Sequence, residues 1–240
     1  MKKVSIIMIV CLFVAALSFA GGSREAEGPS EFVIAATQEP QDLAAQGVYK
    51  EINAIGLRNV IETLTALDPI SGEYIPVLAT SWEWIDDKTV RYEIRQGVKF
   101  HDGTELNAEV AAHMVSFVWN PENSFTIQEF AGPGLISAQA VGLYTIEVTC
   151  AEPDPLLDFR MSLTGISSMQ QIQTNPASHY DRPIGTGPYK FIEWRSGQYW
   201  SAERFNDWWG LTAHDAYGVT KPLFDQIKIV KEILSNWPIP

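Results

Sequence analysis

Cysteine is scarce in this chain. The 240 residues contain only Cys11 and Cys150. Cys11 lies inside an apolar N-terminal run that we expect to be removed on export, which leaves Cys150 without a partner. An internal disulfide in the mature chain and a zinc site built from paired cysteines are therefore excluded.

Positive charge is also in short supply. Seventeen Lys and Arg residues face 29 Asp and Glu residues, which gives a formal net charge of −12. Such a balance argues against binding to nucleic acid or to anionic lipid, because both attract basic surfaces. We therefore expect no nucleic-acid partner, and the acidity fits a soluble exported protein.

The spacings typical of metal sites are missing. No two histidines form a His-x-His or His-x-x-x-His pair, so no metal site is predicted. His101 precedes an Asp102-Gly103 turn, where we expect it to cap or pack. The four histidines are His101, His113, His179 and His214.

Catalytic motifs are missing as well. There is no Gly-x-Ser-x-Gly elbow to carry a nucleophile. Gly185-Thr186-Gly187 lacks the Gly-Lys-Ser ending of a phosphate loop and leads into a predicted strand, which indicates a structural turn. Asp86 and Asp87 lie at a predicted hairpin tip, where acids are ordinary turn formers. We predict no catalytic residue, no cofactor and no enzymatic activity.

The N-terminus has the form of an export signal. Lys2 and Lys3 precede a mostly apolar stretch, residues 5–17, and Ser18-Phe19-Ala20 supplies the small residues that signal peptidase requires. We predict a cleavable signal peptide at residues 1–20, a polar linker at 21–30 and a periplasmic or extracytoplasmic location. An uncleaved membrane anchor is the alternative. A lipid anchor is not expected, because Cys11 lies within the apolar run.

The remaining pattern mixes strands and helices and predicts an α/β or α+β fold. Residues 49–64 show helical spacing, Asn107 is placed to cap a helix that ends at Asn120-Pro121, and residues 165–182 read as a polar loop. Residues 32–36 read as a short buried strand. A hairpin is expected from arms at 81–85 and 89–94, and further strands at 144–149, 189–194, 198–202 and 226–230.

Three stretches together resemble one family. They are Asn59-Val60-Ile61-Glu62-Thr63-Leu64 continuing to Glu83, the run from Thr89 to Thr104, and Gly185-Thr186-Gly187-Pro188-Tyr189 followed by Trp208-Trp209. In this order they are similar to the signature stretches of the extracellular solute-binding family 5, which includes the dipeptide, oligopeptide and nickel receptors of ABC importers. The resemblance covers residues 32–231.

The resemblance implies a periplasmic-binding-protein-like fold of type II, a two-lobe clamp. Residues 31–58 and 180–230 would form the first-lobe sheet, and residues 59–179 an inserted domain. The second lobe of the family is missing from this sequence, and residues 231–240 do not resemble the family. We therefore expect an N-terminal fragment from a truncated or frame-shifted reading frame.

The same resemblance implies non-catalytic capture of a small solute, above all a peptide, and delivery by a monomer to an ABC permease in the cytoplasmic membrane. Ligand identity stays open among peptides, nickel chelates, opines and sugars. A truncated remnant without binding activity, or an interaction module, is the alternative. An extracytoplasmic enzyme would need a nucleophile or an acid pair that the sequence does not supply.

The topology suggests where a solute would be met. The loop after the first strand, Thr37-Gln38-Glu39, should emerge at the ligand-facing edge of the sheet. Residues 47–51 resemble the segment that meets the ligand backbone in peptide-binding relatives, where Tyr49 would stack or hydrogen-bond and Glu51 would face a ligand amine. For each of these residues, surface exposure or core packing is the competing interpretation.

Overall fold

The structure is a computed structural model that describes residues 30–45, 56–123, 136–212 and 222–231. The predictions of a signal peptide, of most of the linker and of the atypical tail fall outside these residues. Tyr49 and Glu51 fall outside them too.

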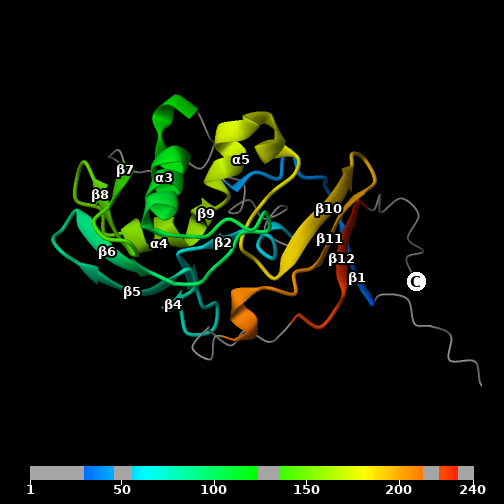
Figure 1. Cartoon of the computed structure of the whole chain (residues 1–240), viewed down its shortest axis with the longest axis horizontal. Coiled ribbons are helices and arrows are strands. Elements are labelled where there is room, and N and C mark those ends of the chain that lie inside the picture. Colours follow the sequence, from blue (N-terminus) through cyan, green and yellow to red (C-terminus); the bar gives the residue numbers. More distant parts are fainter. Residues whose placement is uncertain (1–29, 46–55, 124–135, 213–221, 232–240) are drawn as a thin grey trace, which may run out of the picture. The chain divides into compact units, whose positions relative to one another are not determined.

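One four-stranded sheet combines the beginning and the end of the described chain. Its strands follow the order β1-β12-β11-β10, with β1 parallel to β12 and the other pairs antiparallel (Figure 1). The bounds are β1 Glu31–Ala36, β10 Tyr189–Arg195, β11 Tyr199–Arg204 and β12 Gln226–Lys231. The three late strands agree closely with the predicted stretches at 189–194, 198–202 and 226–230.

The prediction that residues 32–36 are buried was wrong. The strand exists, but the side chains of Phe32 and Val33 are 46% and 51% exposed, and only Ala36 is fully buried. The reason is its position: β1 lies at one edge of the sheet within the described residues, where an apolar run is covered on fewer sides than in a central strand.

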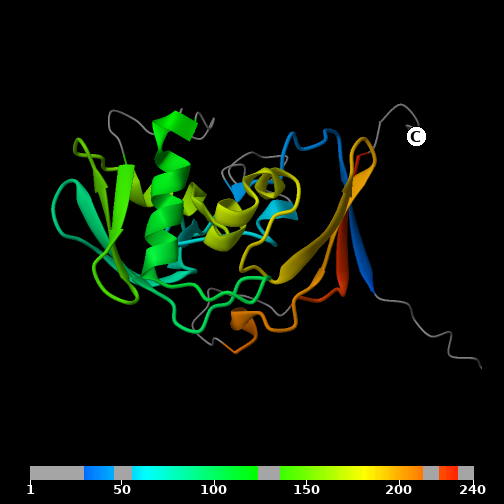
Figure 2. The same ribbon diagram turned by 45° about the horizontal axis from the view of Figure 1, so that its top comes forward.

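A second four-stranded sheet, antiparallel throughout, follows the order β5-β6-β8-β7. It contains the predicted hairpin, which β5 and β6 form. Every second side chain of β6, namely Val90, Tyr92 and Ile94, points to the same face of the sheet and is buried. Helix α3 lies against β7 and β8 (Figure 2). The bounds are β5 Ala79–Trp84, β6 Thr89–Ile94, β7 Ile136–Ala140, β8 Thr145–Cys150 and α3 Ala108–Trp119.

Helix α3 begins and ends as the sequence predicts. The Asn107 side chain accepts a hydrogen bond from the Val110 amide at 3.0 Å, and the helix stops at Trp119 before Asn120-Pro121. Its buried face includes Met114 and Val118.

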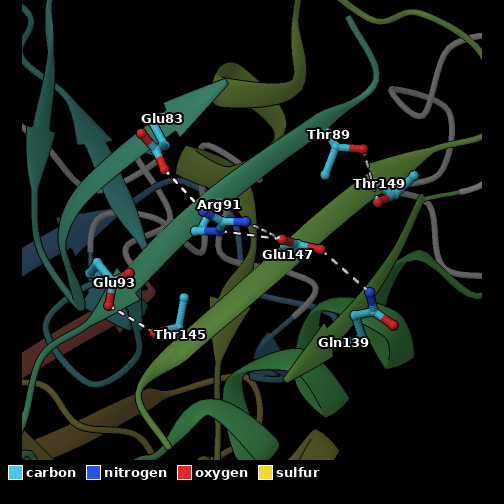
Figure 3. A network of polar contacts seen from close by, with 8 residues as sticks. All are labelled: Glu83, Thr89, Arg91, Glu93, Gln139, Thr145, Glu147 and Thr149. Atoms are coloured by element: carbon cyan, nitrogen blue, oxygen red, sulfur yellow. Dashed lines mark hydrogen bonds and ion pairs between the residues drawn. The ribbon is translucent and has the colours of Figure 1, made fainter. Parts of the chain in front are cut away.

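The other face of this sheet is polar (Figure 3). Arg91 on β6 donates hydrogen bonds to Glu83 on β5 and Glu147 on β8, and Thr145 donates to Glu93 at 2.9 Å. Such cross-strand pairs fix the register of a sheet whose outer face is solvated.

Two local predictions were wrong. Of the predicted helical stretch 49–64, residues 49–55 lie outside the described residues and only 56 and 57 are helical, because a turn and the short strands β2, Glu62–Thr63, and β3, Thr65–Leu67, follow. Residues 165–182 are not a loop, because they contain helix α5, Met169–Thr174, which Ser168 caps by accepting a hydrogen bond from the Gln171 amide at 3.2 Å. Ser168 and Gln171 have the spacing of a capping box, a signal that the polar composition concealed.

The remaining elements are short. They are β2 Glu62–Thr63, β3 Thr65–Leu67, β4 Tyr74–Pro76, η2 Pro121–Asn123, α4 Leu157–Leu163, β9 Gly165–Ile166, α5 Met169–Thr174, η4 Pro176–Tyr180 and η5 Trp209–Leu211.

The Gly185–Gly187 turn packs directly on backbone. A Cβ atom at Gly185 would lie 2.0 Å from the Val60 carbonyl oxygen, and one at Gly187 would lie 2.4 Å from that of Asn59. The Gly187 amide donates to the Val60 carbonyl at 3.0 Å, and His101 Nε2 bonds to the Gly187 carbonyl at 2.9 Å. This turn is structural, as the sequence predicts, and His101 packs against it.

Beside this turn lies a buried carboxylate, Glu62, whose residue is only 6% exposed. It accepts hydrogen bonds from Thr186 Oγ1 at 2.7 Å, Trp208 Nε1 at 3.2 Å and Trp209 Nε1 at 2.8 Å. The Arg95 guanidinium stacks on the Trp209 ring, 4.5 Å from its centroid. One side chain thus joins β2, the glycine turn and η5.

We predict that Glu62 makes stability depend on pH. Burial raises the pKa of Glu62 to about 7 from 4.5, although the three hydrogen bonds and Arg95 act in the opposite direction. The folded state therefore holds this proton more tightly than the unfolded chain does, and stability is lost as pH rises through 7. Between pH 8.5 and 5.5, the free energy of unfolding of the wild type should rise by about 2 kcal/mol relative to Glu62→Gln.

Denaturant unfolding of both proteins at each pH measures this difference. Burial lowers the pKa of His101 and of His179 to about 4, but these contributions are common to both proteins and cancel. The exposed Glu73→Gln is the matched control. A wild-type-to-variant difference that stays constant with pH would contradict the assignment.

A second prediction concerns the glycine turn. Gly187→Ala should lower the free energy of unfolding by about 3 kcal/mol, because the added methyl meets rigid backbone at Asn59. Gly142→Ala is the control: its Cβ would meet the Thr145 side chain at 3.2 Å, and we expect a cost below about 1 kcal/mol. Equal losses in the two variants would show that the close approach is unimportant.

Candidate functional site

The predicted ligand-facing edge is where β1 and β12 end. These parallel strands finish side by side, with Ala36 opposite Lys231. The Lys231 amide donates to the Gln198 carbonyl at 2.8 Å, which brings the turn between β10 and β11 to the same edge. Ligands of open α/β sheets bind outside the carboxyl ends of strands, so this edge is the natural place for a solute.

Glu39 is held in place at this edge. Its carboxylate accepts hydrogen bonds from Trp194 Nε1 at 3.0 Å and from the Gly197 amide at 2.8 Å. Partial burial raises the pKa of Glu39, but the Gly197 and Trp194 hydrogen bonds and the charge of Lys231 outweigh it and hold that pKa below its usual value. An ionised Glu39 therefore fixes the Trp194 indole.

A cavity of about 850 Å³ lies alongside β10. Its volume is within the range of small-molecule sites. One wall is made by the consecutive β10 residues 190–194, and the others come from α5, η4, the loop 181–184 and the turn at His101. Trp194 lines this cavity and also bonds Glu39, so the cavity and the edge at Thr37–Glu39 are adjacent.

Two polar side chains of the cavity are held in place by hydrogen bonds. Its histidine, His101, is buried, bonds the Gly187 carbonyl and accepts from the Gly185 amide at 3.4 Å. Burial lowers the pKa of His101 to about 4, so the ring is neutral and both nitrogens are in use at neutral pH. Gln171 forms part of the wall, and its Nε2 donates to the Arg182 carbonyl at 2.7 Å, which fixes that loop.

Three of the five predicted site residues are described. Thr37 and Gln38 are exposed immediately after β1, and Glu39 is half-buried beside them. Their contact with a solute stays a prediction. Tyr49 and Glu51 lie outside the described residues, so their contact with a solute also stays a prediction.

Sequence reasoning missed three residues at this site: Trp194, Arg182 and Lys190. Trp194 ends a predicted strand just before an Arg-Ser-Gly-Gln turn. That position could have identified Trp194 as a candidate site residue. Arg182 and Lys190 carry no local signal, because only the folding of the 181–184 loop against β10 brings them to one cavity.

Within the described residues, no three His, Cys, Asp or Glu side chains lie close enough together to hold a metal ion. Over the same ranges, no helix has the length and apolar character needed to cross a membrane.

Comparison of the fold gives close matches among solved structures. NikZ of Campylobacter jejuni, determined with Ni(L-His), superposes with a TM-score of 0.72 at 22% identity and covers 85% of this chain. A dipeptide-binding protein of a Pseudoalteromonas species, in complex with Met-Leu, superposes with a TM-score of 0.71 at 20% identity and covers 83% of this chain. The fold is that of type II periplasmic binding proteins, as predicted.

The sequence itself is similar to curated solute-binding proteins. The glutathione-binding protein GsiB of Pectobacterium atrosepticum is 27% identical over 143 residues, which is 56% of this chain. The chain matches only 27% of the length of GsiB and 39% of that of NikZ.

Residues 73–231 match the family described as bacterial extracellular solute-binding proteins, family 5, middle region. The match covers more than half of the chain and includes the hairpin, the glycine turn and the β10–β12 strands. This chain belongs to family 5 of the bacterial extracellular solute-binding proteins.

Proposed function

We propose that the protein captures a short peptide outside the cytoplasmic membrane and delivers it to an ABC permease, without chemical change to the peptide. The observation that carries this proposal is the edge where β1 and β12 end. There an exposed polar loop, Thr37–Glu39, adjoins an aromatic side chain and a cavity of about 850 Å³. Ligand sites of this kind combine an apolar wall with a few placed polar groups.

Relatives support a peptide as the solute. The name of GsiB states that it binds glutathione, and the Pseudoalteromonas protein was determined with the dipeptide Met-Leu. NikZ, which was determined with Ni(L-His), shows that a metal chelate is the competing ligand class. A peptide also fits an edge that offers backbone groups and an indole ring.

Export and domain division are parts of the same proposal. The family is extracellular, and we propose that residues 1–20 direct the chain there as a cleavable signal. Residues 31–58 with 180–230 would act as the solute-binding lobe. Residues 59–179 would form a domain that the hydrogen bonds of Glu62 connect to this lobe.

Peptide binding should stabilise the chain. At a free peptide concentration of 100 times Kd, the folded state gains about 2.7 kcal/mol. For a chain of this size, that gain should raise Tm by about 5 to 10 °C. A thermal melt with mixtures of di- to pentapeptides, and with Ni(L-His) in parallel, measures the effect. A Tm that no mixture changes would contradict capture by this chain and favour the interaction-module alternative.

A further prediction concerns Glu39. Glu39→Gln should weaken peptide binding about threefold to tenfold, because a neutral amide holds the Trp194 and Gly197 donors less well than a carboxylate. Trp194→Phe removes the same hydrogen bond and keeps an aromatic ring. Similar losses in both variants would show that Glu39 acts by positioning Trp194, and a loss in Glu39→Gln alone would show direct contact with the solute.

Calorimetric titration with a peptide that stabilises the wild type measures both affinities. If neither substitution changes the affinity, the edge at β1 and β12 is not part of the binding site.

A further inference from the structure

We propose that residues 208–212, which include η5, form a local flap over Glu62. The flap is docked while the Glu62 carboxyl group holds a proton, and it is released when this group ionises. Release leaves both sheets in place and involves no solute, so this device lies beyond the proposed function. Three features carry it: the way in which the flap is attached, its position between the two proposed domains and the charges around Glu62.

The flap is attached by side chains and not by a sheet. Among the described residues, its backbone hydrogen bonds stay within residues 205–212. Its anchors are two buried indoles, since Trp208 and Trp209 are only 3% and 8% exposed and both donate to Glu62. Gly210 completes the fit, because a Cβ atom there would lie 2.3 Å from the Trp208 ring. A segment without ladder bonds can open locally while the sheets stay intact.

Opening of the flap uncovers the Glu62 carboxylate. Two of its three donors, Trp208 Nε1 at 3.2 Å and Trp209 Nε1 at 2.8 Å, leave with the flap. The third donor, Thr186 Oγ1, stays on the glycine turn. Water then solvates the carboxylate, and water stabilises a charge far better than a protein interior does. An ionised Glu62 therefore favours the open flap, and a protonated Glu62 favours the closed one.

The flap lies where the two proposed domains meet. Glu62 belongs to the stretch 59–179, proposed as a separate domain, and the flap belongs to the stretch 180–230 of the proposed solute-binding lobe. Arg95, from the first of these stretches, stacks on the Trp209 ring at 4.5 Å from its centroid. Release of the flap therefore breaks side-chain contacts between the domains and keeps the backbone contacts of the glycine turn.

The Glu62 carboxyl group titrates in the neutral range. Burial raises its pKa to about 7 from 4.5, against the three hydrogen bonds and the charge of Arg95. His101, which packs on the glycine turn, has a pKa that burial lowers to about 4, so its ring is neutral above pH 5.5. Helix α4 and the chain before η5 contribute further charged groups, which are Arg160 paired with Asp154, Asp158 hydrogen-bonded to Tyr92, and the exposed Asp207.

Hydrogen–deuterium exchange of the full chain, read by mass spectrometry and corrected for the intrinsic exchange rate at each pH, measures the opening. Because the open flap restores a pKa of 4.5, the protection of the Leu211 and Thr212 amides should fall about thirtyfold between pH 5.5 and 8.5. In Glu62→Gln, which lacks the titrating group, the fall should be less than about twofold. The exposed Glu73→Gln is the matched control and should behave as the wild type does.

Two further sets of amides show whether the opening is local. The Val141 amide, which donates to the Thr145 carbonyl at 2.9 Å in the β7–β8 turn, should keep its protection at every pH. The amides of β6 lie between β5 and β8 and should exchange only by global unfolding, with higher protection and a steep dependence on urea. Exchange of the flap should not depend on low urea concentrations.

Flap amides whose protection does not change with pH, or changes equally in Glu62→Gln, would overturn the proposal. One protection factor and one urea dependence shared by the flap and β6 would show that the opening is global, which also overturns it. If Glu62→Gln does not fold, the comparison of flap, Val141 and β6 amides in the wild type decides alone. None of these results bears on peptide capture, which the thermal melt tests.

Discussion

The structure depends on one buried carboxylate. Glu62 is removed from water, and three donors from separate segments converge on it and offset part of the free-energy cost of that burial. The donors belong to the glycine turn and to the Trp208-Trp209 pair, which are among the stretches that carry the family resemblance. These stretches meet at one point in the fold, around the Glu62 side chain.

The glycine turn connects the Glu62 cluster to the proposed binding edge. Gly185 and Gly187 lie against the backbone of Asn59 and Val60, and His101 clamps the turn from the other side. Strand β10 starts directly after the turn, so its placement follows from that contact. The β10 wall of the cavity and Trp194 are therefore positioned by buried backbone contacts, whereas Thr37–Glu39 lie on the loop that follows β1.

Much of the fold could be predicted from local patterns. Alternation in residues 89–94 gave the hairpin, and Asn107 with Asn120-Pro121 gave both ends of α3, because these signals act within a few residues. Burial of β1 was misjudged, since exposure depends on which strands lie beside it and no local pattern contains that information. The α5 helix was missed because composition was weighed above the Ser168–Gln171 spacing.

The site was less predictable than the fold. The topology placed Thr37–Glu39 at the carboxyl ends of β1 and β12, but it could not show that Glu39 would fold back on Trp194 and Gly197. Arg182 and Lys190 are eight positions apart and belong to a loop and a strand. Their proximity to one cavity is a product of tertiary structure alone.

Native mass spectrometry of the full-length protein, purified without denaturation from an exporting bacterium, tests peptide capture most directly. We predict a population whose mass exceeds that of the processed chain by that of a short peptide, and release of this peptide on activation in the gas phase. A spectrum that shows only the unliganded chain, both as purified and after addition of a peptide mixture, would contradict the account.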